Sequence, residues 1–188
     1  MNWYFIRHGQ IASNLNKVYS GRSDEALTET GREQMRPAAR ELTAIDIDAV
    51  YSSPLARTRQ SAEIIVNELQ RDLPIRIDDS FNELQMGPWD GMAEADVEAG
   101  FPAEWALWHS EPAALQLDGR ETLAELQRRV LDGLRAIRQS APGQSVLIVS
   151  HVAVIRMVFL HADRQDLNRY KTIPVDNAKC FHFDGLEL

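Results

Sequence analysis

Short apolar runs and longer amphipathic segments alternate along the chain, and their order predicts its fold class. The apolar runs predict strands at residues 2–8, 47–53, 75–79, 145–150 and 178–183. The amphipathic segments, with apolar residues three or four positions apart, predict helices at residues 27–44, 54–69, 121–140 and 151–162. Strands that alternate with helices form a mostly parallel central sheet with helices on both faces, so the sequence predicts an α/β fold.

The helix predicted at residues 27–44 has two candidate starting points and one unusual residue. Thr28 and Thr30 are both suitable N-caps, because a threonine side chain can accept a hydrogen bond from the first helical turn. Pro37 removes one backbone hydrogen bond from the middle of the segment, which leaves open whether the helix is continuous there.

Residues 81–125 differ from the rest of the chain in both pattern and charge. Short helical pieces are separated there by Gly, Pro and Trp, and the segment carries ten acidic residues but a single cation, Arg120. It also contains Trp89, Trp105 and Trp108, three of the four tryptophans in the chain. We expect at least two of these indoles to pack the segment onto the core, while one is a candidate for lining a pocket.

The composition limits the classes of protein to which the chain can belong. Its 188 residues, 44% of them hydrophobic, are enough for one domain with a sizeable core. A net charge of −8 argues against general nucleic-acid binding. The most apolar stretch, residues 146–162, contains His151, Arg156 and His161, so we expect no membrane span. Arg7 interrupts the apolar start, which argues against a signal peptide, and the single cysteine suits a cytoplasmic location.

Three basic residues lie where the predicted parallel strands end. His8 ends the first strand, Arg57 lies in the first turn of the helix after the second, and His151 follows the strand at 145–150. Ligands of such sheets bind beyond the carboxyl ends of the strands. Arginine side chains and helix N-termini are suited to phosphate oxygens, so we expect an anion site there. Each residue alone has an ordinary structural explanation, and only the combination points to a site.

Phosphoryl transfer would make use of these groups. It needs positive charge around the phosphoryl oxygens, a nucleophile in line, and a proton for the leaving oxygen. A neutral imidazole can be the nucleophile, and a carboxyl group can supply the proton. Gly9, next to His8, would leave room for a phosphate near the backbone or adopt a conformation that other residues resist.

Five segments of the chain resemble one known family in their order and spacing. They are FIRHGQIASN, YSGRSDEALTETGREQ, VYSSPLARTRQSAEII, NELQMGPWDGM and VLIVSHVAVIR. The family is the histidine phosphatase superfamily, which includes cofactor-dependent phosphoglycerate mutase, and the resemblance covers nearly the whole chain. It implies a phosphoglycerate mutase-like fold, with a single domain over residues 1–188 and a variable cap insertion at about residues 84–119.

The resemblance also implies catalytic roles for residues that match the family's motifs. His8 matches the nucleophile that becomes phosphohistidine. Glu83 matches the carboxyl group that acts first as general acid and then as the base for water. Arg7, Arg57 and His151 match the groups that hold the phosphoryl oxygens.

A second set of residues is expected to contact the substrate. By resemblance, Asn14 is a further phosphate contact, and Ser20 and Gly21 belong to a segment that approaches the substrate. Arg22 is a candidate contact from the core side. Residues 152–153 are Val and Ala, where many family members have glycine, so their side chains are expected to narrow the pocket.

The leading functional hypothesis is a phosphomonoesterase that acts on small phosphate esters through phosphohistidine, without a metal or another cofactor. The remaining histidines, His109, His161 and His182, lack the spacing of metal ligands. A mutase is one alternative, although mutases of this family are typically longer. An α-ribazole-phosphate phosphatase is a more specific form of the leading hypothesis. A non-catalytic phosphate binder is the least favoured, because it would need neither His8 nor Glu83.

The sequence indicates neither the physiological substrate nor the oligomeric state. The shortage of cations in residues 81–125, which by resemblance cover the leaving group, argues against a second phosphate there. We therefore expect neutral or aromatic leaving groups to be preferred over bisphosphates.

Overall fold

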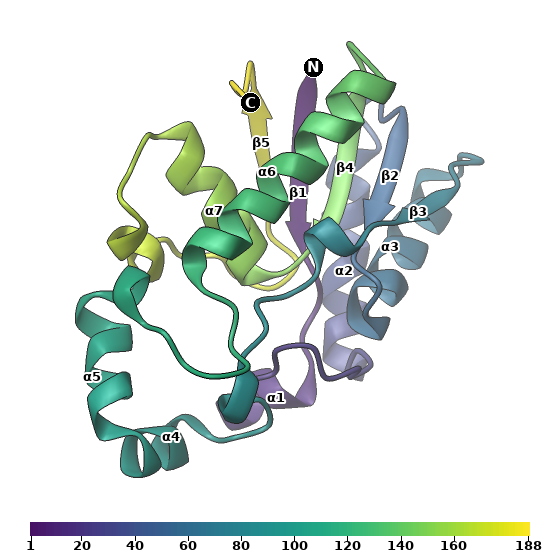
Figure 1. The fold of residues 1–188 in the computed structure, drawn as a ribbon. Helices are drawn as coiled ribbons and strands as arrows, with labels where there is room; N and C mark the ends of the chain where they lie inside the picture. The colour runs from purple at the N-terminus through teal and green to yellow at the C-terminus, as the bar shows by residue number, and fades with distance from the viewer.

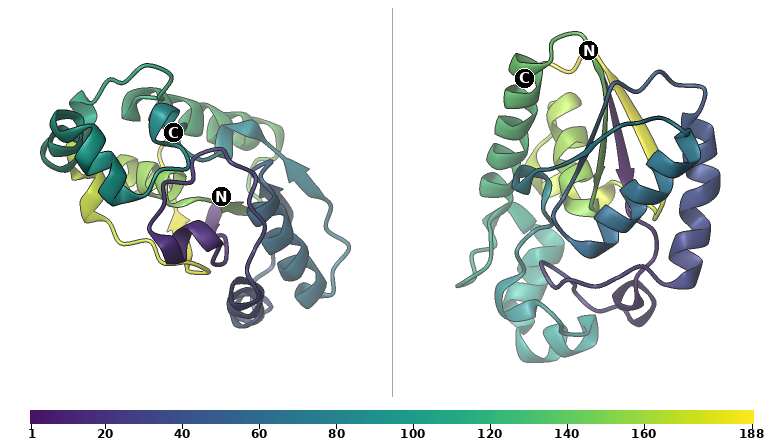
Figure 2. Two further views of the ribbon diagram at one scale, coloured as in Figure 1. Left: turned by 90° about the horizontal axis from the view of Figure 1, so that it is seen from below. Right: turned by 90° about the vertical axis from the view of Figure 1, so that its right-hand side faces the viewer.

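A computed structural model describes residues 1–188 and shows a five-stranded sheet between two layers of helices (Figures 1 and 2). The strands lie in the order β3-β2-β4-β1-β5. They are β1 (Asn2–Arg7), β2 (Ala49–Ser52), β3 (Ile75–Ile77), β4 (Ser145–Ser150) and β5 (Cys180–Asp184). Only β5 is antiparallel to its neighbour β1. The predicted α/β class with a mostly parallel sheet is confirmed.

Strand β4 shows how the hydrophobic pattern produces the layers. Side chains of a strand alternate between the two faces of the sheet. Val146 and Ile148 pack with residues of α6 (Leu123–Ser140) and α7 (Val152–Ala162) on one face. The next residues along, Leu147 and Val149, pack with residues of α2 (Glu29–Leu42) and α3 (Ala56–Leu69) on the other face. Because both faces are covered, the four central residues of the strand, 146–149, are all apolar.

The helix α2 resolves the two open questions in its sequence. Thr28 is the N-cap, since its hydroxyl oxygen accepts a hydrogen bond of 3.0 Å from the Gly31 amide. Pro37 lies inside the helix without ending it.

The apolar stretch at residues 146–162 is divided between β4 and α7. No helix in the structure has both the length and the apolar character that crossing a membrane requires.

Short helices lie beyond the carboxyl ends of the strands. The sequence pattern indicated short helical pieces within residues 81–125 without their bounds, and it missed the short helices outside that segment. Their bounds are Ala12–Asn16 (α1), Asp79–Phe81 (η1), Gly87–Trp89 (η2), Glu94–Gly100 (α4), Pro102–Ser110 (α5), Pro112–Ala114 (η3) and Leu167–Thr172 (η4). Figure 1 shows α1, α4 and α5 at the lower end of the molecule, where the arrowhead of β1 points.

We call residues 84–119 the cap. Trp89 and Trp108 are buried in the larger hydrophobic core, which attaches the cap to the rest of the molecule.

Gly9 and Gly31 bring two backbone segments into close contact at the end of β1. A Cβ atom on either glycine would overlap a carbonyl oxygen, that of Gly31 or that of Gln10 respectively. Gly9 has no positive φ angle, so an unusual backbone conformation does not explain it. The space beside it is filled by Gly31, so room for a phosphate does not explain it either, and both expectations from the sequence are wrong.

We expect Gly31→Ala to lower the free energy of unfolding by about 1–3 kcal/mol, the usual cost of inserting a methyl group where there is no space. Gly100→Ala is the matched control, because no atom lies within 4 Å of a Cβ built there. Urea unfolding of both variants measures the difference. Equal stabilities would show that the backbone contact is not tight.

Candidate active site

His8 follows the last residue of β1 and is 2% exposed. Its Nδ1 donates a hydrogen bond of 2.7 Å to the Gly9 carbonyl oxygen. Burial, with further contributions from Arg57 and Arg7, lowers the pKa of His8 well below its ordinary value. The ring is therefore neutral and carries its lone pair on Nε2, which is the form that a nucleophile needs.

A cavity of about 450 Å³ lies at the carboxyl ends of the strands and contains His8 in its wall. Five of the residues selected from the sequence line it, namely Arg7, His8, Asn14, Ser20 and Glu83. The other four, which are Gly21, Arg22, Arg57 and His151, are not part of the lining. Of the two residues expected to narrow the pocket, Val152 lines the cavity and Ala153 does not.

Arg57 and His151 are fully buried beside His8. The Arg57 Nε donates to the Nδ1 of His151 at 3.3 Å, and His151 Nε2 then donates to the Ser53 hydroxyl oxygen at 2.7 Å. The terminal nitrogens of Arg57 donate to carbonyl oxygens of residues 20–23 at 2.7 and 2.8 Å. The ring centroids of His8 and His151 are 5.2 Å apart. Burial and the nearby Arg57 lower the pKa of His151, so this ring is neutral too.

Glu83 is 7% exposed and follows η1. Burial raises the pKa of its carboxyl group above the ordinary value, although the Leu84 amide and three arginines oppose this shift. Its Oε1 accepts a hydrogen bond of 2.8 Å from the Leu84 amide, and its Oε2 lies 4.0 Å from Nδ1 of His151. A carboxyl group that keeps its proton above the usual pH range is suited to act as a general acid.

Arg22 and Arg129 hold the backbone of Glu83 from outside the cavity. The Glu83 carbonyl oxygen accepts hydrogen bonds from Arg22 Nε at 3.3 Å and from an Arg129 terminal nitrogen at 3.1 Å. Both arginines also pair with Glu121, at 3.6 Å for Arg22 and 2.6 Å for Arg129. Arg22, expected to contact the substrate, thus contacts the backbone of the expected general acid. Arg129 was missed because it belongs to none of the matching segments.

Asn14 and Ser20 reach the cavity from α1 and from the loop after it. The Asn14 Oδ1 accepts hydrogen bonds from the Ile11 amide and from Asn177 Nδ2, both at 3.2 Å. Asn177 also donates to the His8 carbonyl oxygen at 2.9 Å. Gly21 is tied to the cap, since its amide donates to Asp90 Oδ1 at 2.8 Å. Asn177 carries no sequence signal, because it lies far from the other site residues along the chain.

Comparison with known proteins shows the family of the chain. The sequence model of the histidine phosphatase superfamily (branch 1) matches residues 3–185. The chain belongs to the histidine phosphatase superfamily. It is 31% identical over 173 residues to phosphoserine phosphatase 1 of Hydrogenobacter thermophilus, covering 92% of this chain and 81% of that protein. The resemblance found in the sequence is thereby confirmed.

Other relatives of this histidine phosphatase are also phosphatases. Over 159 residues it is 26% identical to the adenosylcobalamin/alpha-ribazole phosphatase of Escherichia coli, covering 84% of this chain and 77% of that protein. Among solved structures, YhfR of Bacillus stearothermophilus superposes with a TM-score of 0.92 at 25% identity, covering 98% of this chain and 92% of that one. The protein is therefore a phosphatase of this superfamily, and its relatives differ in the substrates that their names give.

The cations that line the cavity of this histidine phosphatase do not come from residues 81–125. Arg120 is buried against two indoles, with its guanidinium carbon 4.4 Å from the centroid of Trp108 and 5.6 Å from that of Trp89. Arg156 of α7 and Lys171 of η4 line the cavity instead. The expectation that the composition of residues 81–125 sets the charge around the leaving group is therefore wrong. Sequence reasoning missed Arg156 as a cavity residue. Its position within a matching segment, five residues after His151, could have pointed to it.

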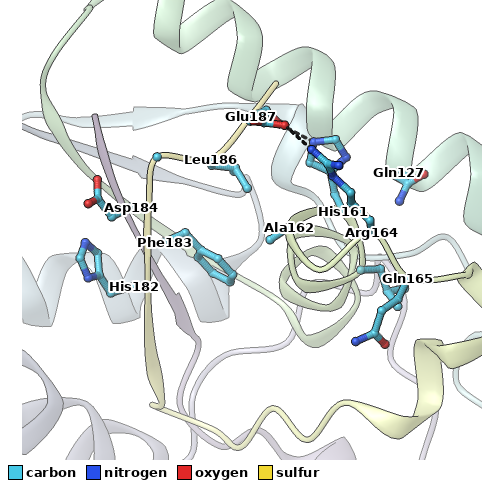
Figure 3. A pocket seen from close by; sticks show the side chains of 12 residues that line it. Gln127, His161, Ala162, Arg164, Gln165, His182, Phe183, Asp184, Leu186 and Glu187 are labelled. Carbon is cyan, nitrogen blue, oxygen red and sulfur yellow. Dashed lines mark hydrogen bonds and ion pairs between the residues drawn. The ribbon is translucent and has the colours of Figure 1, made fainter.

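A larger cavity of the histidine phosphatase, about 680 Å³, lies elsewhere, between the C-terminal end of α7 and the last residues of the chain (Figure 3). Three of its polar residues pair with one another. Arg164 forms an ion pair of 2.8 Å with Glu187, and His161 Nε2 donates to the Glu187 carbonyl oxygen. No group of three or more His, Cys, Asp and Glu residues in the structure could hold a metal ion. The smaller cavity beside His8 is therefore the candidate active site.

Proposed function

We propose that this protein hydrolyses small-molecule phosphate monoesters through a phosphohistidine intermediate on His8. The observation that supports this most directly is the state of His8. Its Nδ1 is engaged by the Gly9 carbonyl oxygen, burial keeps the ring neutral, and the residue lines the same cavity as Arg7 and Glu83. A nucleophile, a cation and a protonated carboxyl group are the three parts that phosphoryl transfer requires.

Arg7 is suited to hold the transferred group. One terminal nitrogen donates to the Val175 carbonyl oxygen at 2.6 Å, while its Nε is buried and has no hydrogen-bond acceptor in the protein. Buried donors normally have an acceptor, and a phosphoryl oxygen in the cavity would provide one. Arg57, one layer deeper, adds positive potential and holds residues 20–23 in place, while the neutral His151 ring accepts a hydrogen bond from Arg57.

In the proposed reaction, His8 Nε2 attacks the phosphorus atom as the bond to the leaving oxygen breaks. Glu83 gives its proton to that oxygen, so the alcohol leaves uncharged. The resulting Glu83 carboxylate then takes a proton from water as the water oxygen attacks the phosphorus atom of phosphohistidine. Inorganic phosphate is released, and both His8 and Glu83 return to their starting states.

The test is the release of inorganic phosphate from p-nitrophenyl phosphate and from a panel of alkyl phosphates. Transfer of the phosphoryl group to a second position of a sugar acid, rather than to water, would favour the mutase alternative. Binding without turnover would favour the non-catalytic alternative. The α-ribazole-phosphate alternative requires that ester to give the highest kcat/KM of the panel.

We expect activity to be independent of added metal ions, because the guanidinium groups of Arg7 and Arg57 supply positive charge around the phosphoryl group. Dialysis against EDTA is expected to change kcat by less than about twofold, which is less than about 0.5 kcal/mol in the barrier. Vanadate, which resembles a five-coordinate phosphoryl group, is expected to inhibit. A complete loss of turnover in EDTA that a divalent metal restores would contradict this expectation.

The proposal includes a small-molecule partner, a cytoplasmic location and no binding to nucleic acid or membranes. It is supported by the net charge of −8 and by the single cysteine, Cys180. Burial raises the pKa of the Cys180 thiol to about 11, so the thiol is protonated and unreactive at neutral pH.

A further inference from the structure

We propose that Arg156 and Lys171 form a subsite for a carboxylate group on the leaving alcohol. The inference rests on the proposed function and narrows its substrate class to phosphate esters of small hydroxy acids or amino acids. Both side chains line the cavity that contains His8 and Glu83. They come from α7 and η4, which lie outside the cap.

Arg156 is anchored at one edge of its guanidinium group. Its Nε donates a hydrogen bond of 2.9 Å to the Ile173 carbonyl oxygen, and its guanidinium carbon lies 4.9 Å from the centroid of the Tyr170 ring. No acidic residue forms an ion pair with it. An arginine that is fixed in this way can present its terminal nitrogens to a carboxylate at little cost in side-chain entropy.

Lys171 is a second cation in the cavity wall without an acidic partner. Its Nζ donates to His109 Nε2 at 2.7 Å and lies 5.6 Å from the centroid of Trp105 and 5.4 Å from that of Trp108. Its burial lowers the pKa of the ammonium group to about 8, although Glu94 opposes that shift. An anion in the cavity would stabilise the charged form of Lys171.

The remaining charges favour a single carboxylate over a second phosphate. Glu94 and Asp176 also line the cavity, and both would repel a dianion more strongly than a monoanion. About 450 Å³ must hold the phosphoryl group as well as the alcohol, which favours a compact leaving group. The shortage of cations in residues 81–125 predicted a preference for neutral leaving groups. The lining of the cavity favours leaving groups with a carboxylate instead, and bisphosphates remain disfavoured.

Two matched substrate pairs test the subsite in the unmodified protein. O-phospho-L-serine is compared with O-phosphoethanolamine, which lacks only the carboxylate. 3-Phosphoglycerate is compared with glycerol phosphate, in which a hydroxymethyl group replaces the carboxylate. We expect kcat/KM to be about 10- to 100-fold higher for the carboxylate member of at least one pair, the range for hydrogen bonds to a charged group.

Two variants assign the preference to these side chains. Arg156→Gln and Lys171→Gln are each expected to reduce the preference by about 10-fold or more, mainly through KM, because each removes a charged partner of the carboxylate. Arg36→Gln, on an exposed position of α2, is the control that should keep the preference. Lys171→Gln keeps the test decisive if Arg156→Gln fails to fold.

Turnover of p-nitrophenyl phosphate separates failure of this inference from failure of the proposed function. No turnover of any ester would contradict the proposed function itself. Turnover with equal kcat/KM values within both pairs would overturn the carboxylate subsite. The subsite would also be overturned if 2,3-bisphosphoglycerate were the best substrate, or if both variants retained the full preference of the unmodified protein.

Discussion

Replacing His8 with alanine is expected to reduce kcat to less than about one hundredth of its normal value, a rise of more than about 2.7 kcal/mol in the barrier. No other side chain can form the covalent intermediate if His8 is the nucleophile. The loss should be similar for alkyl and aryl phosphates, since both would pass through the same phosphohistidine. Steady-state turnover of p-nitrophenyl phosphate and of glycerol phosphate measures it.

The fold of the His8→Ala variant is expected to persist, because the only hydrogen bond of this side chain is to the carbonyl oxygen of the next residue, Gly9. Circular dichroism and urea unfolding check this point. His182→Ala, on the exposed face of β5, is the matched control and should retain full activity. Acid-labile, base-stable phosphoprotein should be trapped from the unmodified protein and not from His8→Ala. A variant that retains more than about one hundredth of kcat would refute the assignment.

Glu83→Gln is expected to lower kcat/KM for alkyl phosphates by about 100- to 10,000-fold and for aryl phosphates by much less. An alkoxide is a poor leaving group that needs a proton, whereas a nitrophenolate can leave without one. The ratio kcat/KM is the right quantity because it reports phosphohistidine formation, before Glu83 is needed again as a base. The glutamine side chain still offers an oxygen to the Leu84 amide, so the local structure is retained.

The pH dependence provides a second readout of the Glu83 role. Burial raises the pKa of this carboxyl group, so its acid form persists at a higher pH than for an exposed glutamate. For alkyl phosphates, kcat/KM should fall as the pH rises through this raised pKa, because the proton donor is lost. Glu83→Gln should lack that decrease, and Glu98→Gln, an exposed residue of α4, should show it unchanged. Equal rate losses for alkyl and aryl esters would contradict a general-acid role.

The layered fold was predictable because its main signals are local. The alternation of buried side chains in β4 and the helical spacing in α2, α3, α6 and α7 depend on residues that are close in the sequence. Short helical pieces in the cap were also expected, but their bounds were not predictable, since they are stabilised by packing between aromatic residues that are separated in the sequence. Trp89, for example, contacts Trp105 and Trp108 with ring centroids 6.5 and 6.4 Å away.

The core of the site was also accessible from the sequence. Parallel strands end at the same edge of a sheet, so residues that follow β1 and β4 must lie close together. His8 and His151 do so. The same reasoning did not distinguish residues that line the cavity from residues that hold the backbone around it. Arg57 and Arg22 bind backbone carbonyl groups, and only the packed structure shows which way their side chains point.

The charge of the cavity was decided by the tertiary structure alone. Residues 81–125 form an acidic segment with one cation, Arg120. Arg120 is enclosed by indoles, whereas Arg156 and Lys171 enter the cavity from the C-terminal part of the chain. The charge of a continuous segment says little about a pocket that it only partly encloses, because a pocket wall is assembled from side chains of several segments. The sequence by itself thus determined the sheet, its helices and the residues at the strand ends, since those depend on local periodicity and strand direction. The surroundings of the leaving group depend on long-range packing, and only the folded chain defines them.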